Sequence, residues 1–124
     1  MYSAFKYYSK PKGEVVSKLE KALRHEKNIL LAIVFGSFVE FNKYRDIDLA
    51  VYTLRKDLGY LAKLSAKLEL ELGIPVDVVP IDEAPVTLRY KILTKGTVIL
   101  ERAEGIFEAL LSQTLDELYI LEHS

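Results

Sequence analysis

Residues 29–37 read Ile-Leu-Leu-Ala-Ile-Val-Phe-Gly-Ser, and residues 46–51 read Asp-Ile-Asp-Leu-Ala-Val. The first run begins with seven consecutive apolar residues. A continuous run of this kind is typical of a strand that is covered on both faces of its sheet. The strand is predicted to stop at Gly36 and Ser37, because both residue types are typical of turns. The second run predicts another buried strand over 47–52, with one aspartate just before it and another as its second residue.

Helices and further strands are predicted on both sides of this centre. Apolar residues recur at helical spacing between Gly13 and Asn28 and again from Leu58 to Leu72, where Gly73 and Pro75 end the pattern. Further elements are expected as a strand over 76–81, a helix capped by Asp82 that runs to about Leu93, a strand over 97–101 and a last helix over 103–121. The alternation of strands and helices predicts a mixed α/β layer fold with about four strands.

Composition limits the possible architecture and partners. The 124 residues are expected to form one domain, 1–124, because a chain of this length buries one core. The 17 basic and 18 acidic residues nearly cancel, so extended binding of nucleic acid or of an anionic membrane is not expected. The chain has no cysteine, which excludes disulfides and thiolate zinc sites and fits the cytoplasm. The longest uncharged apolar stretch, Ile29 to Val39, is shorter than the roughly 20 residues of a membrane span.

The aspartates of the second run are the first candidates for chemistry. Alternate residues of a strand face the same side, so Asp46 and Asp48 are expected to project together with Cα atoms about 6.6 Å apart. Two like charges at this separation repel each other unless a cation neutralises them. Carboxylate oxygens on a rigid strand suit magnesium, which also recruits phosphate oxygens from a substrate. The pair therefore predicts a magnesium site that a phosphate-bearing substrate completes.

Three further residues complete this candidate site. Gly36 lacks a Cβ atom and so lets the backbone approach a phosphate closely, and Ser37 adds a hydroxyl donor. Asp77 lies between β-branched residues in Pro75-Val76-Asp77-Val78-Val79, where a buried carboxylate needs a partner such as a metal ion. If its strand pairs beside the Asp46/Asp48 strand, Asp77 adds a third carboxylate that can accept a proton from an attacking hydroxyl.

The Gly-Ser turn, the Asp-Ile-Asp-Leu segment and the lone aspartate in an apolar strand together resemble the minimal nucleotidyltransferases of the DNA polymerase β superfamily. The resemblance covers roughly Ile29 to Glu101. It implies a twisted mixed sheet backed by helices and magnesium-dependent transfer of a nucleoside monophosphate, AMP from ATP, to a hydroxyl acceptor. The catalytic and metal-binding roles then fall on Asp46, Asp48 and Asp77, in a two-metal arrangement, and nucleotide binding falls on Gly36 and Ser37.

The same resemblance implies a protein partner. Small members of the family often act as the antitoxin of a helical HEPN-type toxin, which they neutralise by adenylylation. Eight residues separate Ser37 from Asp46, fewer than is common in such members, and Arg45 stands where a serine usually precedes the Asp-Ile-Asp. A catalytically weak binding module that neutralises its partner by steric capture is therefore the alternative hypothesis. An enzyme that modifies RNA or DNA ends alone is disfavoured by the near-zero net charge.

Both ends of the chain carry apolar side chains that allow two interpretations. Residues 2–10 interleave aromatic rings with lysines, a pattern that fits either packing on a core edge or stacking on single-stranded nucleic acid, and we favour packing. The last helix presents a stripe of Phe107, Leu110, Leu111, Leu118 and Leu121. This stripe is expected either to pack on the sheet or to form a contact between subunits in a homo-oligomer. His25 and His123 are interpreted as surface residues.

Overall fold

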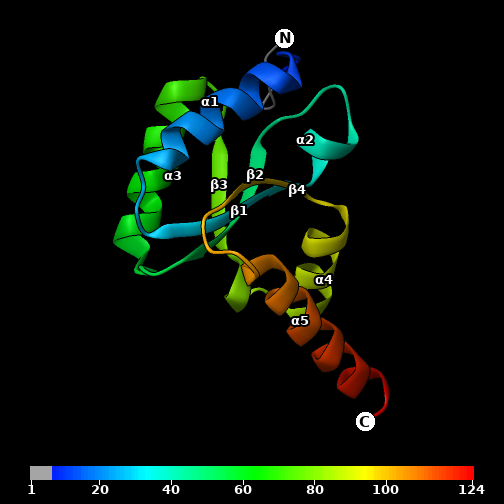
Figure 1. The fold of residues 1–124 in the computed structure, drawn as a ribbon. Coiled ribbons are helices and arrows are strands. Elements are labelled where there is room, and N and C mark those ends of the chain that lie inside the picture. The colour runs from blue at the N-terminus through cyan, green and yellow to red at the C-terminus, as the bar shows by residue number, and fades with distance from the viewer. Residues whose placement is uncertain (1–6) are drawn as a thin grey trace.

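The computed structural model describes residues 7–124, and within them strands and helices alternate (Figure 1). In chain order the elements are α1 Lys12–Arg24, β1 Ile29–Phe35, α2 Ser37–Glu40, β2 Ile47–Thr53, α3 Leu58–Leu72, β3 Val76–Pro80, the 3-10 turn η1 Ile81–Glu83, α4 Val86–Lys95, β4 Thr97–Glu101 and α5 Ile106–Glu122. No helix in this part of the chain is long and apolar enough to cross a membrane.

The four strands form one sheet in the order β3-β2-β1-β4. β1 is antiparallel to both of its neighbours, whereas β2 and β3 are parallel. This mixed sheet with flanking helices confirms the predicted α/β (α+β) fold. Because β1 runs against β2 and β3, its last residue lies at the same end of the sheet as their first residues.

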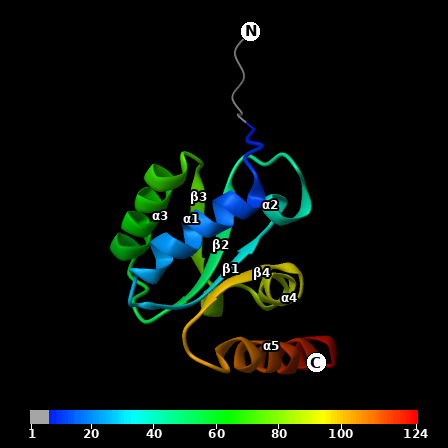
Figure 2. The same cartoon turned by 45° about the horizontal axis from the view of Figure 1, so that its top comes forward.

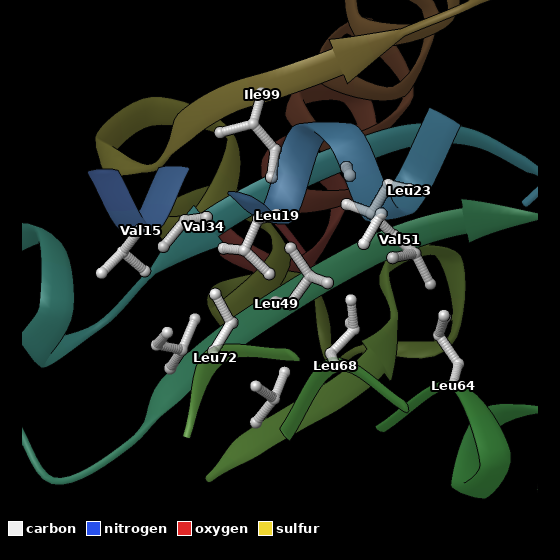
Figure 3. Close-up of a cluster of buried hydrophobic side chains, with 14 of the residues drawn as sticks. Val15, Leu19, Leu23, Val34, Leu49, Val51, Leu64, Leu68, Leu72 and Ile99 are labelled. Atoms are coloured by element: carbon white, nitrogen blue, oxygen red, sulfur yellow. The ribbon is translucent and has the colours of Figure 1, made fainter. Parts of the chain in front are cut away.

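Helices cover both faces of the sheet (Figure 2). On one face, α1 and α3 pack against the sheet through a large apolar cluster that includes Leu19, Leu49 and Leu68 (Figure 3). On the other face, α4 and α5 pack over a smaller cluster that includes Ile33 and Ile92. The residues of β1 alternate between the two clusters, which explains why its sequence is continuously apolar.

Two predicted helix starts are wrong. Asp82 does not cap a helix but lies in η1, where it forms an ion pair with Lys56, and α4 starts only after Pro85. Proline fits the first position of a helix but breaks its interior, so Pro85 sets the start of α4. The last helix begins at Ile106 rather than at residue 103, because Gly105 adopts a φ of 89° that ends the preceding turn.

The end of β1 also differs from the prediction in one respect. Ser37 was expected in a plain turn, but it begins the short helix α2. The strands themselves agree with the predicted ranges to within one residue at each end. His25 and His123 are both exposed, as expected.

Candidate functional site

Gly36 lies where β1 meets α2, and its conformation explains why this position is a glycine. Its φ is 79°, in the left-handed region that side chains rarely adopt. A Cβ atom at this position would overlap the Oδ2 oxygen of Asp48. The carboxylate of Asp48 thus lies close to the backbone of Gly36, and any side chain at position 36 would be strained and would displace it. Ser37 follows as the first residue of α2.

The strand register brings Asp48 and Asp77 side by side. Asp48 of β2 pairs with Phe35 on one side and with Asp77 of β3 on the other. Ile47 and Leu49, which flank Asp48, lie in the α1/α3 cluster, so Asp48 faces the opposite side of the sheet. The flanking Val76 and Val78 of β3 belong to the same cluster, and Asp77 therefore shares the face of Asp48.

The carboxyl group of Asp48 is shielded from water and lies near two other carboxylates. The pKa of Asp48 is raised to about 6, first because the half-buried carboxyl loses contact with water and then because Asp46 and Asp77 carry negative charge nearby. Asp77, by contrast, is exposed. Asp46 lies just before the first residue of β2 and is partly buried. The site is thus an electronegative patch with one shielded carboxyl and one that solvent reaches freely.

The chemistry of these oxygens fits magnesium, although they do not form a compact cage. Across residues 7–124, no three histidine, cysteine or acidic side chains lie close enough together to hold a metal ion as a group. Electrostatic repulsion acts over a longer range than a metal–oxygen bond. The neighbouring carboxylates can therefore raise the pKa of Asp48 without lying close enough to share one metal ion. The overlap that a Cβ at Gly36 would cause shows that backbone and carboxylate form a tight cradle. Magnesium suits such an open site because it keeps several waters and takes phosphate oxygens as ligands.

The N-terminal segment 8–12 holds the chain between Ser37 and Asp46, and we call this segment the N-terminal clasp. Tyr8 and Tyr44 exchange two backbone hydrogen bonds, with N···O distances of 2.7 and 3.1 Å. Tyr44 is 1% exposed, and its hydroxyl donates to the carbonyl oxygen of Lys10 at 3.1 Å. Its ring meets Phe38 of α2 edge to face at 4.7 Å between centroids.

The clasp also reaches α2 directly. The Nζ atom of Lys12 lies 3.4 Å from the carbonyl oxygen of Val39 and 5.7 Å from the ring centre of Phe38. Because Phe38 follows Ser37 and Tyr44 precedes Asp46, the clasp positions both ends of the loop that links the glycine-serine turn to the aspartates. The predicted packing role of the N-terminal aromatics is confirmed for Tyr8 but not for Tyr7, which is 61% exposed, and Tyr2 and Phe5 lie outside the described residues.

Residues 17–105 match the family described as "Polymerase beta, Nucleotidyltransferase". The chain belongs to this family. No curated protein matches the sequence.

Solved structures of toxin–antitoxin complexes contain similar chains. One, a tri-AMPylated Shewanella oneidensis HEPN toxin in complex with MNT antitoxin, has 25% identity and a TM-score of 0.75, with 91% of each chain covered. A second, a toxin-antitoxin with AMP-PNP, has 26% identity and a TM-score of 0.76, and the match covers 87% of this chain and 90% of that one. A third, the MntA-HepT toxin-antitoxin, shares the fold at 24% identity and a TM-score of 0.73, with 90% of each chain covered.

The structure thus places Gly36, Ser37, Asp46, Asp48 and Asp77 at one end of the sheet, while their catalytic, nucleotide-binding and metal-binding roles stay predictions. Sequence reasoning missed the residues that hold this arrangement. Phe35 is the direct cross-strand neighbour of Asp48, and Tyr44 anchors the loop. Tyr44 had a signal in the sequence, because it is the one aromatic residue in the polar stretch 42–46.

Proposed function

We propose that this nucleotidyltransferase-family chain is a magnesium-dependent enzyme that transfers AMP from ATP to a hydroxyl group on a HEPN-type toxin, and so acts as its antitoxin. The observation that carries this proposal is the row formed by Gly36, Asp48 and Asp77 at one end of the sheet. Such a row places the glycine backbone before α2 directly beside two carboxylates. The raised pKa of Asp48 supports the proposal, because a carboxyl held near other carboxylates gains from binding a cation.

The solved relatives support the choice of nucleotide and partner. One similar chain comes from a complex with an AMPylated HEPN toxin, and another comes from a complex with AMP-PNP. Both have identities of 25% or more and TM-scores above 0.7 over most of this chain. ATP is therefore the proposed nucleotide and a HEPN-type helical protein the proposed partner, and the whole of residues 1–124 is proposed to act as one domain in the cytoplasm.

Each site residue has a distinct proposed role. Asp46 and Asp48 would hold magnesium, and Asp77 would complete a two-metal site and accept the proton of the attacking hydroxyl. The hydroxyl oxygen would bond to the α-phosphorus of ATP, and pyrophosphate would leave with the bridging oxygen. The backbone at Gly36 and the hydroxyl of Ser37 would hold the triphosphate against the sheet. When bound, magnesium supplies positive charge that stabilises the attacking and leaving oxygens of phosphoryl transfer. The exposure of Asp77 suits its role, because an acceptor must reach it from outside.

The direct test uses ATP labelled at the α-phosphate, magnesium, the purified chain and its co-expressed HEPN-type partner. Label is expected to appear on the partner protein, and its appearance is expected to require magnesium. Calorimetry on the free chain measures ATP binding in parallel. Absence of label on the partner together with absence of ATP binding would overturn the proposal.

Steric capture without catalysis is the second candidate function. It is favoured by the lack of a compact acidic cluster among residues 7–124 and by the short connection between Ser37 and Asp46. It predicts that Asp46→Asn and Asp48→Asn variants still neutralise the toxin in cells. Loss of neutralisation by these variants, with the complex still isolated intact, would exclude steric capture and leave the enzymatic proposal.

A further inference from the structure

A groove of about 380 Å³ lies between the edge strand β3 and the first turns of α3. One wall contains Asp77, Val78 and Pro80 of β3, and the opposite wall contains residues of α3 from Leu58 to Ser65. We propose that this groove binds the segment of the partner protein that carries the accepting hydroxyl group. The inference rests on the proposed function, and it adds where the acceptor docks and what chemistry the acceptor segment has.

Asp77 connects the groove to the carboxylate row. It pairs with Asp48 and shares the face of Asp48, on the side of the sheet away from α3, but β3 is the edge strand and Asp77 also lines the groove. A segment that lies in the groove therefore passes Asp77 at the edge of the sheet. A group that removes a proton must come within hydrogen-bond reach of the accepting hydroxyl. Asp77 is exposed whereas Asp48 is half-buried, so Asp77 is the carboxylate that an incoming hydroxyl meets first.

The walls of the groove suit apolar side chains. Leu58 at the start of α3 is 84% exposed, and Ala62, one turn later, is also exposed. Val78 and Pro80 face them from β3. A volume of about 380 Å³ is at the low end of ligand pockets, which suits a short peptide segment with apolar side chains beside its hydroxyl-bearing residue.

The free edge of β3 offers backbone recognition as well. β3 is the last strand of the sheet, with β2 on one side and no strand of the described residues on the other. An extended segment can add to such an edge through main-chain hydrogen bonds. The hydroxyl of Ser65 donates to the carbonyl oxygen of Val76, so α3 already covers the edge before Asp77 and leaves the part after it open.

The charges of the groove favour a protein acceptor over a nucleic acid. Its ionisable side chains are Lys56, Asp77 and Glu83, which together carry a net charge of −1 when ionised (one positive and two negative). Lys56 is also engaged in an ion pair with Asp82. A phosphate backbone needs an excess of unpaired cations along its path, and this groove has the opposite balance.

Two leucines of α3 provide a matched test. Leu58 lines the groove and is 84% exposed, whereas Leu70 is 88% exposed and lies outside it. In Leu58→Arg, a long charged side chain blocks the groove, and the same substitution at Leu70 changes the helix surface elsewhere. Ala62→Arg blocks the groove from a second position and keeps a good helix former at that site.

Transfer of label to the HEPN-type partner, affinity for that partner without nucleotide, and affinity for magnesium-ATP are measured for each variant. Leu58→Arg and Ala62→Arg are expected to lower kcat/KM for the partner by about tenfold or more. Their affinity for magnesium-ATP is expected to equal that of the unmodified chain. Leu70→Arg is expected to keep all three properties within about twofold.

Three outcomes separate this inference from the proposed function. Normal transfer and normal partner affinity in both groove variants would overturn the groove assignment while leaving the enzyme intact. If the unmodified chain transfers no label but both groove variants lose partner affinity, the transferase proposal fails and the groove stands as the docking surface. Label on RNA ends, with none on the partner protein, would overturn the assignment of a protein acceptor.

Discussion

The two halves of β2 differ in what they contribute to the protein. From Leu49 to Val51 every residue is fully buried, and Leu49 and Val51 pack against α1 and α3. At the start of the strand, Asp48 is half-buried next to two other carboxylates, and its pKa is raised to about 6. The buried half stabilises the fold, whereas the acidic half lowers stability at neutral pH. A carboxylate with such a cost at the start of a buried strand is typical of a binding or catalytic site, which is the role proposed for it.

The largest effect is expected from removing the charge of Asp48. Asp48→Asn is expected to lower transfer activity by about 10³-fold, because a metal ligand contributes several kcal/mol to the transition state. The rate of AMP transfer to the partner at saturating ATP measures this. Asp116→Asn, at an exposed position of α5, is the control and is expected to transfer at the unmodified rate. An Asp48→Asn variant that keeps a large part of its activity would contradict the functional assignment of this half of β2.

The buried half of β2 is tested by Leu49→Ala. Loss of a fully buried leucine is expected to lower the free energy of unfolding by about 2–5 kcal/mol. Urea unfolding measures the loss, with Val98→Ala on β4 as the control because Val98 is 41% exposed. The folded fraction of Leu49→Ala is expected to keep its affinity for magnesium-ATP. A loss in Leu49→Ala no larger than that in Val98→Ala would show that the buried half of β2 does not stabilise the fold as described.

A smaller effect of opposite sign is expected when the stability of Asp48→Asn is measured. The pKa of Asp48 is about 6 in the folded chain and 3.8 in the reference state, so the unfolded chain loses its proton first as the pH rises. Stability therefore falls between these two pH values and stays lower above them. The penalty is about 1–2 kcal/mol, below the full value for this shift because solvent screens a half-exposed group.

Asp48→Asn is accordingly expected to be more stable than the unmodified chain at about pH 7.5 and equally stable at about pH 3. Urea unfolding at both pH values, without magnesium, measures the difference. A variant that is less stable at neutral pH would show that the ionised carboxylate of Asp48 makes stabilising interactions in the protein without magnesium. The repulsion between the carboxylates would then be absent.

The smallest effect is expected at the clasp. Tyr44→Phe removes the hydrogen bond to the carbonyl oxygen of Lys10 and is expected to cost about 1 kcal/mol. Amide hydrogen exchange of the 41–46 loop is expected to accelerate, and the affinity for magnesium-ATP to fall, because Asp46 lies two residues beyond Tyr44. Tyr7→Phe, at a 61% exposed position, is the control. Unchanged exchange in Tyr44→Phe would show that the hydroxyl does not hold the loop.

The helices α3 and α5 show where sequence-based prediction succeeds and where it stops. Both are rich in leucine, and both were predicted from periodicity. Of the pattern that runs from Leu58 to Leu72 in α3, the leucines at 61, 64, 68 and 72 are buried and Leu58 is 84% exposed. In α5 the buried residues are Leu110 and Thr114. Leu121, part of the predicted stripe, is 55% exposed, and the C-terminal end of α5 points away from the sheet (Figure 1). Periodicity predicts the helix, but the extent of the protein surface beneath the helix decides how many of its apolar side chains are buried.

Two apolar residues outside the predicted stripe are exposed beside Leu121. Ile120 is 65% exposed and Tyr119 is 63% exposed, so the outer half of α5 presents apolar side chains to solvent. Contact between two copies of the chain through this surface stays a prediction, which sedimentation of the free chain tests. The family match ends at residue 105, before α5 begins.

The sequence by itself determined the strands, most helices and the end of β1 at Gly36. These features depend on backbone preferences and on periods of two or 3.6 residues, which act over a few neighbouring positions. The tertiary structure decided that β3 pairs with β2, which puts Asp77 next to Asp48, that the clasp holds Tyr44, and that a groove opens beside Asp77. Each of these contacts joins residues far apart in the chain, and only the packing of the whole sheet and its helices selects such partners.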